Sequence, residues 1–145
     1  MSSSGYRDRS AGAPGHRPSE FELRAIIQEG DTKLLLQWAE DTGKDLARQL
    51  TTSQIRNIFG TVRQIEMSWS PQATEREQQW AARQFMLLKP KLAYQAKRER
   101  GRGVEQLAEV LTPAIDMVGE DRERFQRFVD FFEAILAYHT AYGGF

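Results

Sequence analysis

Apolar residues recur at three- and four-residue steps through most of this chain from about residue 19 onward. The clearest case follows Thr51, where one stripe contains Ile55, Ile58, Phe59, Val62, Ile65 and Trp69. This spacing predicts a helix with one buried face. Thr51 and Gln54 have the spacing of a capping box at its start. Ser70 precedes Pro71 and should end the helix, because a residue before proline disfavours the helical conformation.

The same periodicity predicts helices on both sides of that segment. Two short helices are expected before it, the first ending at Gly30 and the second weakened at Gly43. A long helix is expected from about residue 73 to 99, with a kink near Met86–Pro90 because proline removes a backbone donor and clashes with the preceding turn. A further helix is expected over residues 104–118.

The last predicted helix, over about residues 121–142, has an unusually wide apolar surface and ends at a glycine cap signal, Gly143-Gly144. Its main stripe is Phe125, Phe128, Val129, Phe132, Ile135, Leu136 and His139, and a second set is Phe131, Ile135, Tyr138 and Tyr142. Such a helix is either central to a bundle or in contact with another subunit. Tyr138, Tyr142 and Phe145 are therefore the candidate subunit contacts.

These patterns predict an all-α fold, a compact bundle of about five helices in a single domain over residues 19–145. No sustained alternation or hairpin signal competes with the helical periodicity. Residues 1–18 are rich in Ser, Gly, Pro and Arg. They are predicted to form a disordered tail, because such a segment buries too little apolar surface to offset its ordering entropy.

Positive charge is concentrated in one window of a chain that is neutral overall, with Lys+Arg 20 and Asp+Glu 20. The window covers residues 87–102, and Glu99 is its only acid; its basic residues are Lys89, Lys91, Lys97, Arg98, Arg100 and Arg102. Lys91 and Arg98 are seven residues apart and so share one helical face. Arg102 would extend this row if the helix continued.

A local basic row of this kind can follow successive phosphates of a nucleic acid, and Tyr94 beside it can stack on a base or pack. A weaker row consists of Arg56 and Arg63, also seven apart, with Gly60 between them permitting close approach of a backbone. A solvated helix face remains the plain alternative for both rows. A third possibility is that the main row binds an acidic protein partner.

No pattern of catalytic or metal-binding residues is recognisable, so we expect neither an enzyme nor a bound metal or cofactor. His139 lies on an apolar face, which indicates a buried structural histidine, and His16 falls in the predicted tail. Glu120 and Asp121 suit a helix start, although a nuclease would need such carboxylates to converge. The lack of cysteine fits a cytoplasmic protein, and no apolar run approaches the roughly 20 residues that span a membrane.

Three blocks of sequence carry a resemblance to a known family. They are Leu50-Thr51-Thr52-Ser53-Gln54-Ile55-Arg56-Asn57-Ile58-Phe59, Leu88-Lys89-Pro90-Lys91-Leu92-Ala93-Tyr94, and Phe131-Phe132-Glu133-Ala134-Ile135-Leu136-Ala137-Tyr138-His139 closing with Tyr142-Gly143-Gly144. In order and spacing they resemble the small helical subunit of the type III-A CRISPR effector, the Csm complex. The resemblance covers roughly residues 46–145.

The resemblance implies a non-catalytic helical bundle that stacks in several copies as the inner filament of the complex, in antiviral defence. It also implies contact with the guide RNA–target RNA duplex, mainly with the target strand, and with the other Csm subunits. Carried over position by position, it assigns RNA contacts to Lys89, Lys91, Arg56, Lys97 and Arg98. The residues alone leave two functions open: an RNA-binding structural subunit, and a protein–protein adaptor whose basic row binds an acidic partner without RNA contact.

Overall fold

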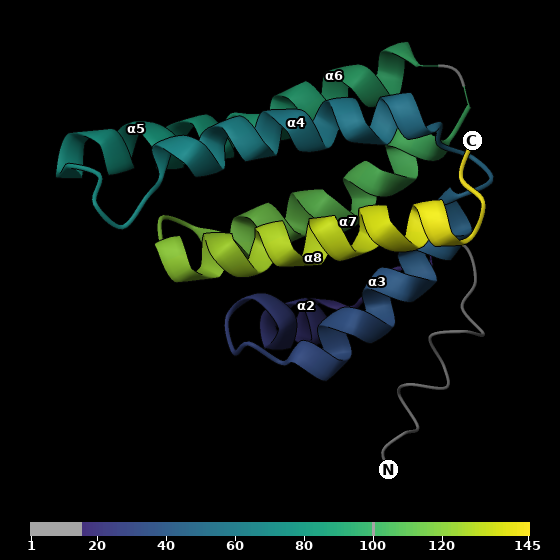
Figure 1. Ribbon diagram of the computed structural model, residues 1–145, viewed down its shortest axis with the longest axis horizontal. Coiled ribbons are helices and arrows are strands. Elements are labelled where there is room, and N and C mark those ends of the chain that lie inside the picture. Colours follow the sequence, from purple (N-terminus) through teal and green to yellow (C-terminus); the bar gives the residue numbers. More distant parts are fainter. Residues whose placement is uncertain (1–15, 100) are drawn as a thin grey trace.

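The computed structural model describes residues 16–99 and 101–145, and every regular element in those ranges is an α-helix (Figure 1). The helices are α2 (Glu20–Ile27), α3 (Thr32–Leu46), α4 (Thr52–Ser68), α5 (Glu75–Met86), α6 (Leu88–Arg98), α7 (Gly103–Val118) and α8 (Arg122–Ala141). The all-α prediction is confirmed for this part of the chain. The helices outnumber the predicted five mainly because one long helix is divided.

Side-chain caps determine where several helices begin. The Thr51 hydroxyl accepts the Gln54 backbone N–H at 3.1 Å, and the Gln54 side chain accepts the Thr51 backbone N–H at 2.9 Å. Ser19 and Thr74 head equivalent capping boxes at α2 and α5. These bonds satisfy N–H groups that have no partner inside the helix. The capping box predicted at the start of α4 is therefore confirmed.

The helix predicted over residues 73–99 is divided at Leu87, within the predicted kink. The Leu87 N–H still bonds the Arg83 carbonyl at 3.0 Å and completes α5. Pro90 is the third residue of α6, where the missing N–H would have had no helical partner. The proline therefore lies in the first turn of a new helix rather than inside a kinked one.

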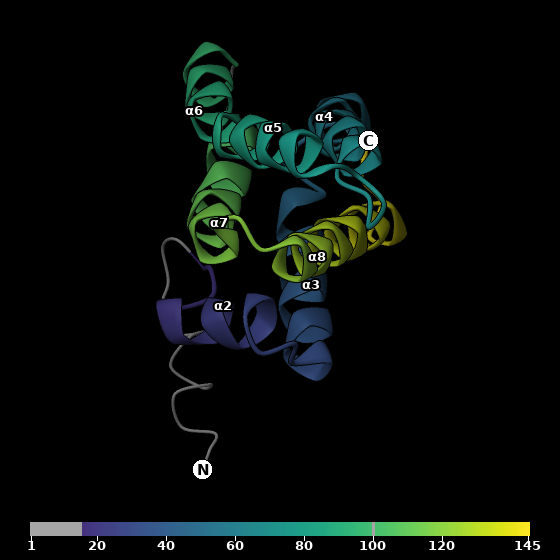
Figure 2. The same cartoon turned by 90° about the vertical axis from the view of Figure 1, so that its left-hand side faces the viewer.

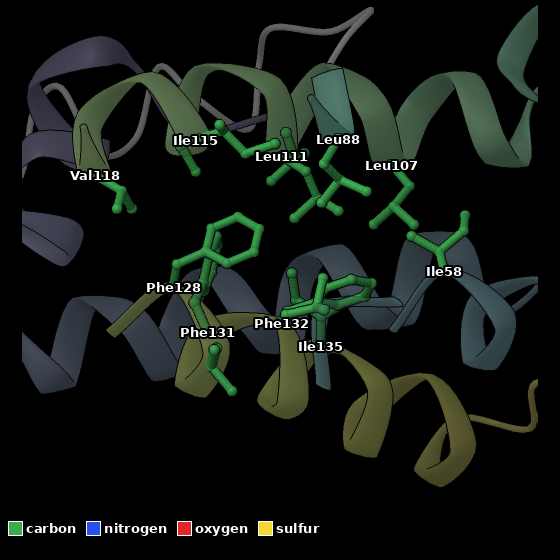
Figure 3. Packing of buried hydrophobic residues seen from close by; sticks show 14 of the residues in the cluster. Ile58, Leu88, Leu107, Leu111, Ile115, Val118, Phe128, Phe131, Phe132 and Ile135 are labelled. Carbon is green, nitrogen blue, oxygen red and sulfur yellow. The ribbon is translucent and has the colours of Figure 1, made fainter. Parts of the chain in front are cut away.

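Helix α8 is the centre of the bundle and packs against α2, α3, α4 and α7 (Figures 1 and 2). Phe131 and Ile135 from its second apolar set are fully buried. Figure 3 shows Phe128 and Phe132 of α8 facing the α7 side chains that include Leu111. Much of the wide apolar surface of α8 is thus used inside the chain, as expected for a central helix.

Glycine allows the closest of these helix contacts. Gly43 is buried within α3, and a Cβ added there would lie 2.7 Å from the Tyr138 Cβ and 2.8 Å from the His139 nitrogen of α8. Helix α3 continues through Gly43 without interruption. The residue that weakens the helix in the sequence is therefore the one that lets α3 and α8 approach each other.

The C-terminal end of α8 is closed on itself and joined to the α3–α4 connection. Gly143 has φ +89, and the Gly144 N–H bonds the His139 carbonyl at 2.8 Å, as in a glycine-terminated helix. His139 is fully buried, and its Nε2 lies 2.6 Å from the Leu50 carbonyl oxygen. Because a carbonyl only accepts, Nε2 is the protonated nitrogen. His139 is the buried structural histidine that the sequence predicts.

The structure describes only the end of the predicted N-terminal tail. Residues 1–15 lie outside the described residues. Pro18 is buried, and the His16 ring packs edge-on against Trp38 of α3 with a centroid distance of 5.2 Å. The last residues of the predicted tail therefore lie against the bundle.

Candidate nucleic-acid interface

The two basic segments that the sequence singles out meet at one end of the molecule. The Gln54 side chain at the start of α4 donates to the Glu99 carboxylate after α6 at 2.9 Å. Gly103, the first residue of α7, packs so closely on the α3–α4 connection that a Cβ there would lie 2.3 Å from the Gln49 carbonyl oxygen. The C-terminus lies at this same end (Figure 1). We call it the α6 end.

Helix α6 carries three exposed cations, of which Lys97 and Arg98 lie in the last turn, at the α6 end, and Lys91 nearer the start of the helix. Lys91 and Lys97 form no ion pair with any described residue. Arg98 lies 5.9 Å from the Tyr94 ring centroid and makes only a long contact of 3.9 Å with Glu99. The Tyr94 ring is 64% exposed. Among the described residues, no acid lies closer than 3.9 Å to the charged group of any of these three cations.

The helix does not continue to Arg102, in agreement with the helix end expected near residue 99. Helix α6 ends at Arg98, because Glu99 is extended at φ −77 and ψ 146. Arg102 instead precedes α7, and its Nε lies 3.4 Å from a Glu105 carboxylate oxygen. Arg102 still belongs to the α6 end, but on a different helical axis. Arg100 lies outside the described residues.

Lys89 differs from the other cations of the basic segment. It is half-buried and pairs with Asp116 of α7. Lys89 and Asp116 are 27 positions apart, so this pair ties the start of α6 to the last turns of α7. Its charge is already compensated, so Lys89 is less suited than Lys91 to attract an external anion.

Helix α4 contributes one free cation rather than two. Arg56 is exposed, has no ion pair among the described residues, and lines a shallow hollow with Asn57. Arg63 bonds Glu66 at 2.8 Å and lies over the Phe59 ring. Gly60 between them has open space around it, which permits the close backbone approach that the sequence suggests.

The candidate subunit contacts form an aromatic surface near the C-terminus. The Tyr142 hydroxyl donates to the Glu40 carboxylate at 2.5 Å, and this bond raises the pKa of Tyr142 because it favours the protonated phenol. The Lys44 ammonium lies 5.6 Å from the Tyr142 ring centroid. Phe145 is 69% exposed, while Tyr138 is half-buried beside Tyr142. Tyr142 is therefore held by its own chain, whereas Phe145 projects into solvent.

Sequence reasoning missed an exposed apolar surface at the connection between α4 and α5. Met67 is 81% exposed and Trp80 is 53% exposed, and both line a hollow that also contains Arg76. This connection lies at the opposite end of the molecule from the C-terminus (Figure 1). Trp80 immediately precedes the buried Ala81 and is off the apolar stripe. A tryptophan outside the buried stripe was the sequence signal that could have indicated this exposed surface.

The acidic residues considered for nuclease chemistry do not converge. Asp121 caps α8 by accepting the Arg124 N–H at 3.0 Å, and Glu120 is exposed. Within residues 16–99 and 101–145, no group of three or more His, Asp or Glu residues is placed to hold a metal ion. None of the helices described combines the length and apolar character needed to cross a membrane.

The fold and this end together define a small helical subunit with an uncompensated basic surface. A sequence model described as Csm2 Type III-A matches residues 29–144, and the chain therefore belongs to this family, that of a small structural subunit of the type III-A CRISPR Csm complex. The match also includes α3, which the resemblance over residues 46–145 left out. No curated protein and no solved structure matches the chain.

Proposed function

We propose that this chain is a non-catalytic, RNA-binding subunit that contacts the backbone of the guide–target duplex, mainly the target RNA strand, through the α6 end. Its place of action would be the cytoplasm, within the assembled Csm complex. The observation that carries the proposal is the set of exposed cations without a close acidic partner among the described residues: Lys91, Lys97, Arg98 and Arg56. Lys89, Arg63 and Arg102 are secondary contacts, since each has an acidic partner.

Phosphate contact suits a subunit of an RNA-guided complex. Base pairing between guide and target supplies the sequence specificity there, so the protein needs only to recognise the backbone. Each uncompensated cation that meets a phosphate releases a condensed counterion, which makes the affinity depend on salt. Tyr94 adds an exposed ring on which a base can stack.

The test is a titration of labelled single-stranded RNA with the purified protein over a range of salt concentrations. The variant Lys91→Gln, Lys97→Gln, Arg98→Gln removes three free cations. A matched control, Arg24→Gln, Lys33→Gln, Arg124→Gln, removes the same net charge from α2, α3 and α8. The slope of log affinity against log salt should fall by about 2 in the first variant, at about 0.7 for each phosphate contact with a single strand.

Equal slopes and affinities for the two variants would overturn the RNA proposal. The adaptor function would then be favoured, provided that the α6 variant also fails to join the purified complex while the control variant joins it. Circular dichroism of both variants shows whether the helical fold is retained.

We also propose that neighbouring copies of the chain meet end to end. Such a heterologous contact needs two different surfaces on one molecule. The aromatic surface of Tyr138, Tyr142 and Phe145 lies at one end, and that of Met67 and Trp80 at the other. Trp80→Ser, or Tyr142→Ser with Phe145→Ser, should lower the number of copies per complex in native mass spectrometry. An unchanged copy number in both variants would remove this contact.

A further inference from the structure

A polar cavity of about 360 Å³ lies where α3, α7 and the N-terminal residues meet. His16 and Arg17 cover one side of it, the C-terminal half of α3 forms the floor, and α7 supplies Gln106 and Glu109. Neither the basic row of α6 nor the aromatic surface near the C-terminus includes these residues. The cavity is therefore a separate feature of the molecule.

Two residues that line the cavity have buried polar atoms without a partner among the described residues. Thr42 is only 4% exposed, and its Oγ1 has no hydrogen-bond partner among the described residues. The Gln106 Oε1 is also buried, and it too lacks a partner in this part of the chain. Leaving such groups unpaired is costly, and native proteins rarely do so without a reason. A bound molecule with a donor and an acceptor would satisfy both.

The charges around the cavity favour an anion at its rim. Glu109 is paired with Arg17 at 3.1 Å, and the Asp45 carboxylate lies 3.7 Å from the His16 ring. Arg48 is exposed at the rim and pairs with no acid among the residues that the structure describes. The cavity thus combines a free cation outside with hydrogen-bonding groups inside.

The cavity also adjoins the α6 end. Gly103 packs on the Gln49 carbonyl, so Arg102 lies beside the connection that carries Arg48. Helix α7 begins there without a side-chain cap, and its first residue is buried against this connection. A strand that follows the cations of α6 would reach Arg102 and then the rim of the cavity.

We infer that this cavity holds one nucleotide of an RNA strand, with its phosphate toward Arg48 and Arg102 and its base against Thr42 and Gln106. This inference rests on the proposed RNA-binding function and extends it to a specific subsite. A nucleotide joins the features that the site requires: an anion, a planar group with hydrogen-bond donors and acceptors, and a size that suits the cavity. An acidic side chain would satisfy Arg48 but would leave the Gln106 oxygen without a donor.

The test uses the full chain with the double variant Thr42→Val, Gln106→Leu, which keeps the shape of the cavity and removes its polar atoms. Its thermal stability should be unchanged or higher, because unpaired buried groups are replaced by apolar ones. Its affinity for single-stranded RNA should fall about tenfold, the order expected when hydrogen bonds to the base are lost. The matched control is Thr32→Val, Gln79→Leu, at exposed positions of α3 and α5.

A second measurement locates the RNA without any substitution. RNA carrying 4-thiouridine is crosslinked by light to the wild-type chain, and the attached peptides are identified by mass spectrometry. Crosslinks within residues 42–49 or 106–110 are expected. Their absence, or unchanged RNA affinity in the cavity variant, overturns the inference, even where the α6 variant loses affinity and so upholds the proposed function.

Binding of adenosine 5′-monophosphate shows whether the cavity takes a free mononucleotide or a nucleotide that is part of an RNA strand. We expect it to bind weakly and to be displaced by RNA, because only a strand also engages the α6 cations. The assignment to an RNA strand would be overturned by two results together. The mononucleotide would bind tightly to both the wild-type chain and the α6 variant, and RNA would give no crosslinks in the cavity. If only the α6 variant loses RNA binding, the proposed function stands and the inferred subsite is overturned.

Discussion

The same substitution, glycine to alanine, is expected to have opposite effects at Gly43 and Gly60. Both residues lie inside helices. At Gly43 an added Cβ would lie 2.7 Å from the Tyr138 Cβ and 2.8 Å from the His139 backbone nitrogen. Those atoms cannot move aside by rotating a side chain. At Gly60, apart from its chain neighbours and the adjacent backbone of its own helix, no described atom lies within 4 Å of the new Cβ.

The magnitudes follow from two opposing terms. Alanine is favoured over glycine in a helix interior by about 1 kcal/mol, which is the whole effect at Gly60. At Gly43 the carbon–carbon contact must lengthen by roughly 0.8 Å to reach an ordinary distance near 3.5 Å. Overpacking of this kind typically costs about 1–3 kcal/mol, so the gain in helix propensity is cancelled or exceeded. The difference between the two terms is a net loss of up to about 2 kcal/mol at Gly43.

The assay is thermal and urea unfolding of the two variants and the wild-type chain, followed by far-ultraviolet circular dichroism. For a chain of this size each kcal/mol corresponds to about 2–4 °C in Tm. Gly60→Ala should therefore melt about 3 °C higher, whereas Gly43→Ala should melt no higher than the wild-type chain and up to about 6 °C lower. A comparable rise in Tm for both variants would refute the argument that the approach of α3 to α8 is limited by Gly43.

Three further predictions concern contacts between distant segments. A double-mutant cycle of Lys89→Ala and Asp116→Ala in urea should give a coupling of about 0.2–1 kcal/mol, and a zero coupling would show that the pair does not tie α6 to α7. Gly144→Ala should destabilise the chain by about 1–3 kcal/mol in the same assay, because the Cβ would lie 2.1 Å from the His139 ring; an unchanged Tm would contradict that packing. Burial raises the pKa of Asp45, so the folded state binds this proton more tightly and stability falls as pH rises above the ordinary aspartate range. Asp45→Asn should therefore raise Tm at pH 7, by an amount that shrinks on acidification through that range, whereas a lower Tm at pH 7 would contradict this sign.

Features that depend on neighbouring residues could be predicted from the sequence. The Thr51–Gln54 capping box, the buried stripe of α4 and the glycine end at Gly143 each involve residues within about one helical turn. The burial of His139 followed from its place on an apolar face. The resemblance to the family could also be found from the sequence, because it rests on three contiguous blocks of residues in a fixed order.

Features that join distant residues were decided only by the tertiary structure. Arg102 lies at the start of α7 and not on α6, and Lys89 is compensated by a residue 27 positions away. The cavity around Thr42 arises from how α3, α7 and the N-terminal residues meet, and no local pattern encodes it. Helical periodicity indicates which face of each helix is apolar. Which neighbour covers that face, and which charges it brings, depends on packing across the whole chain.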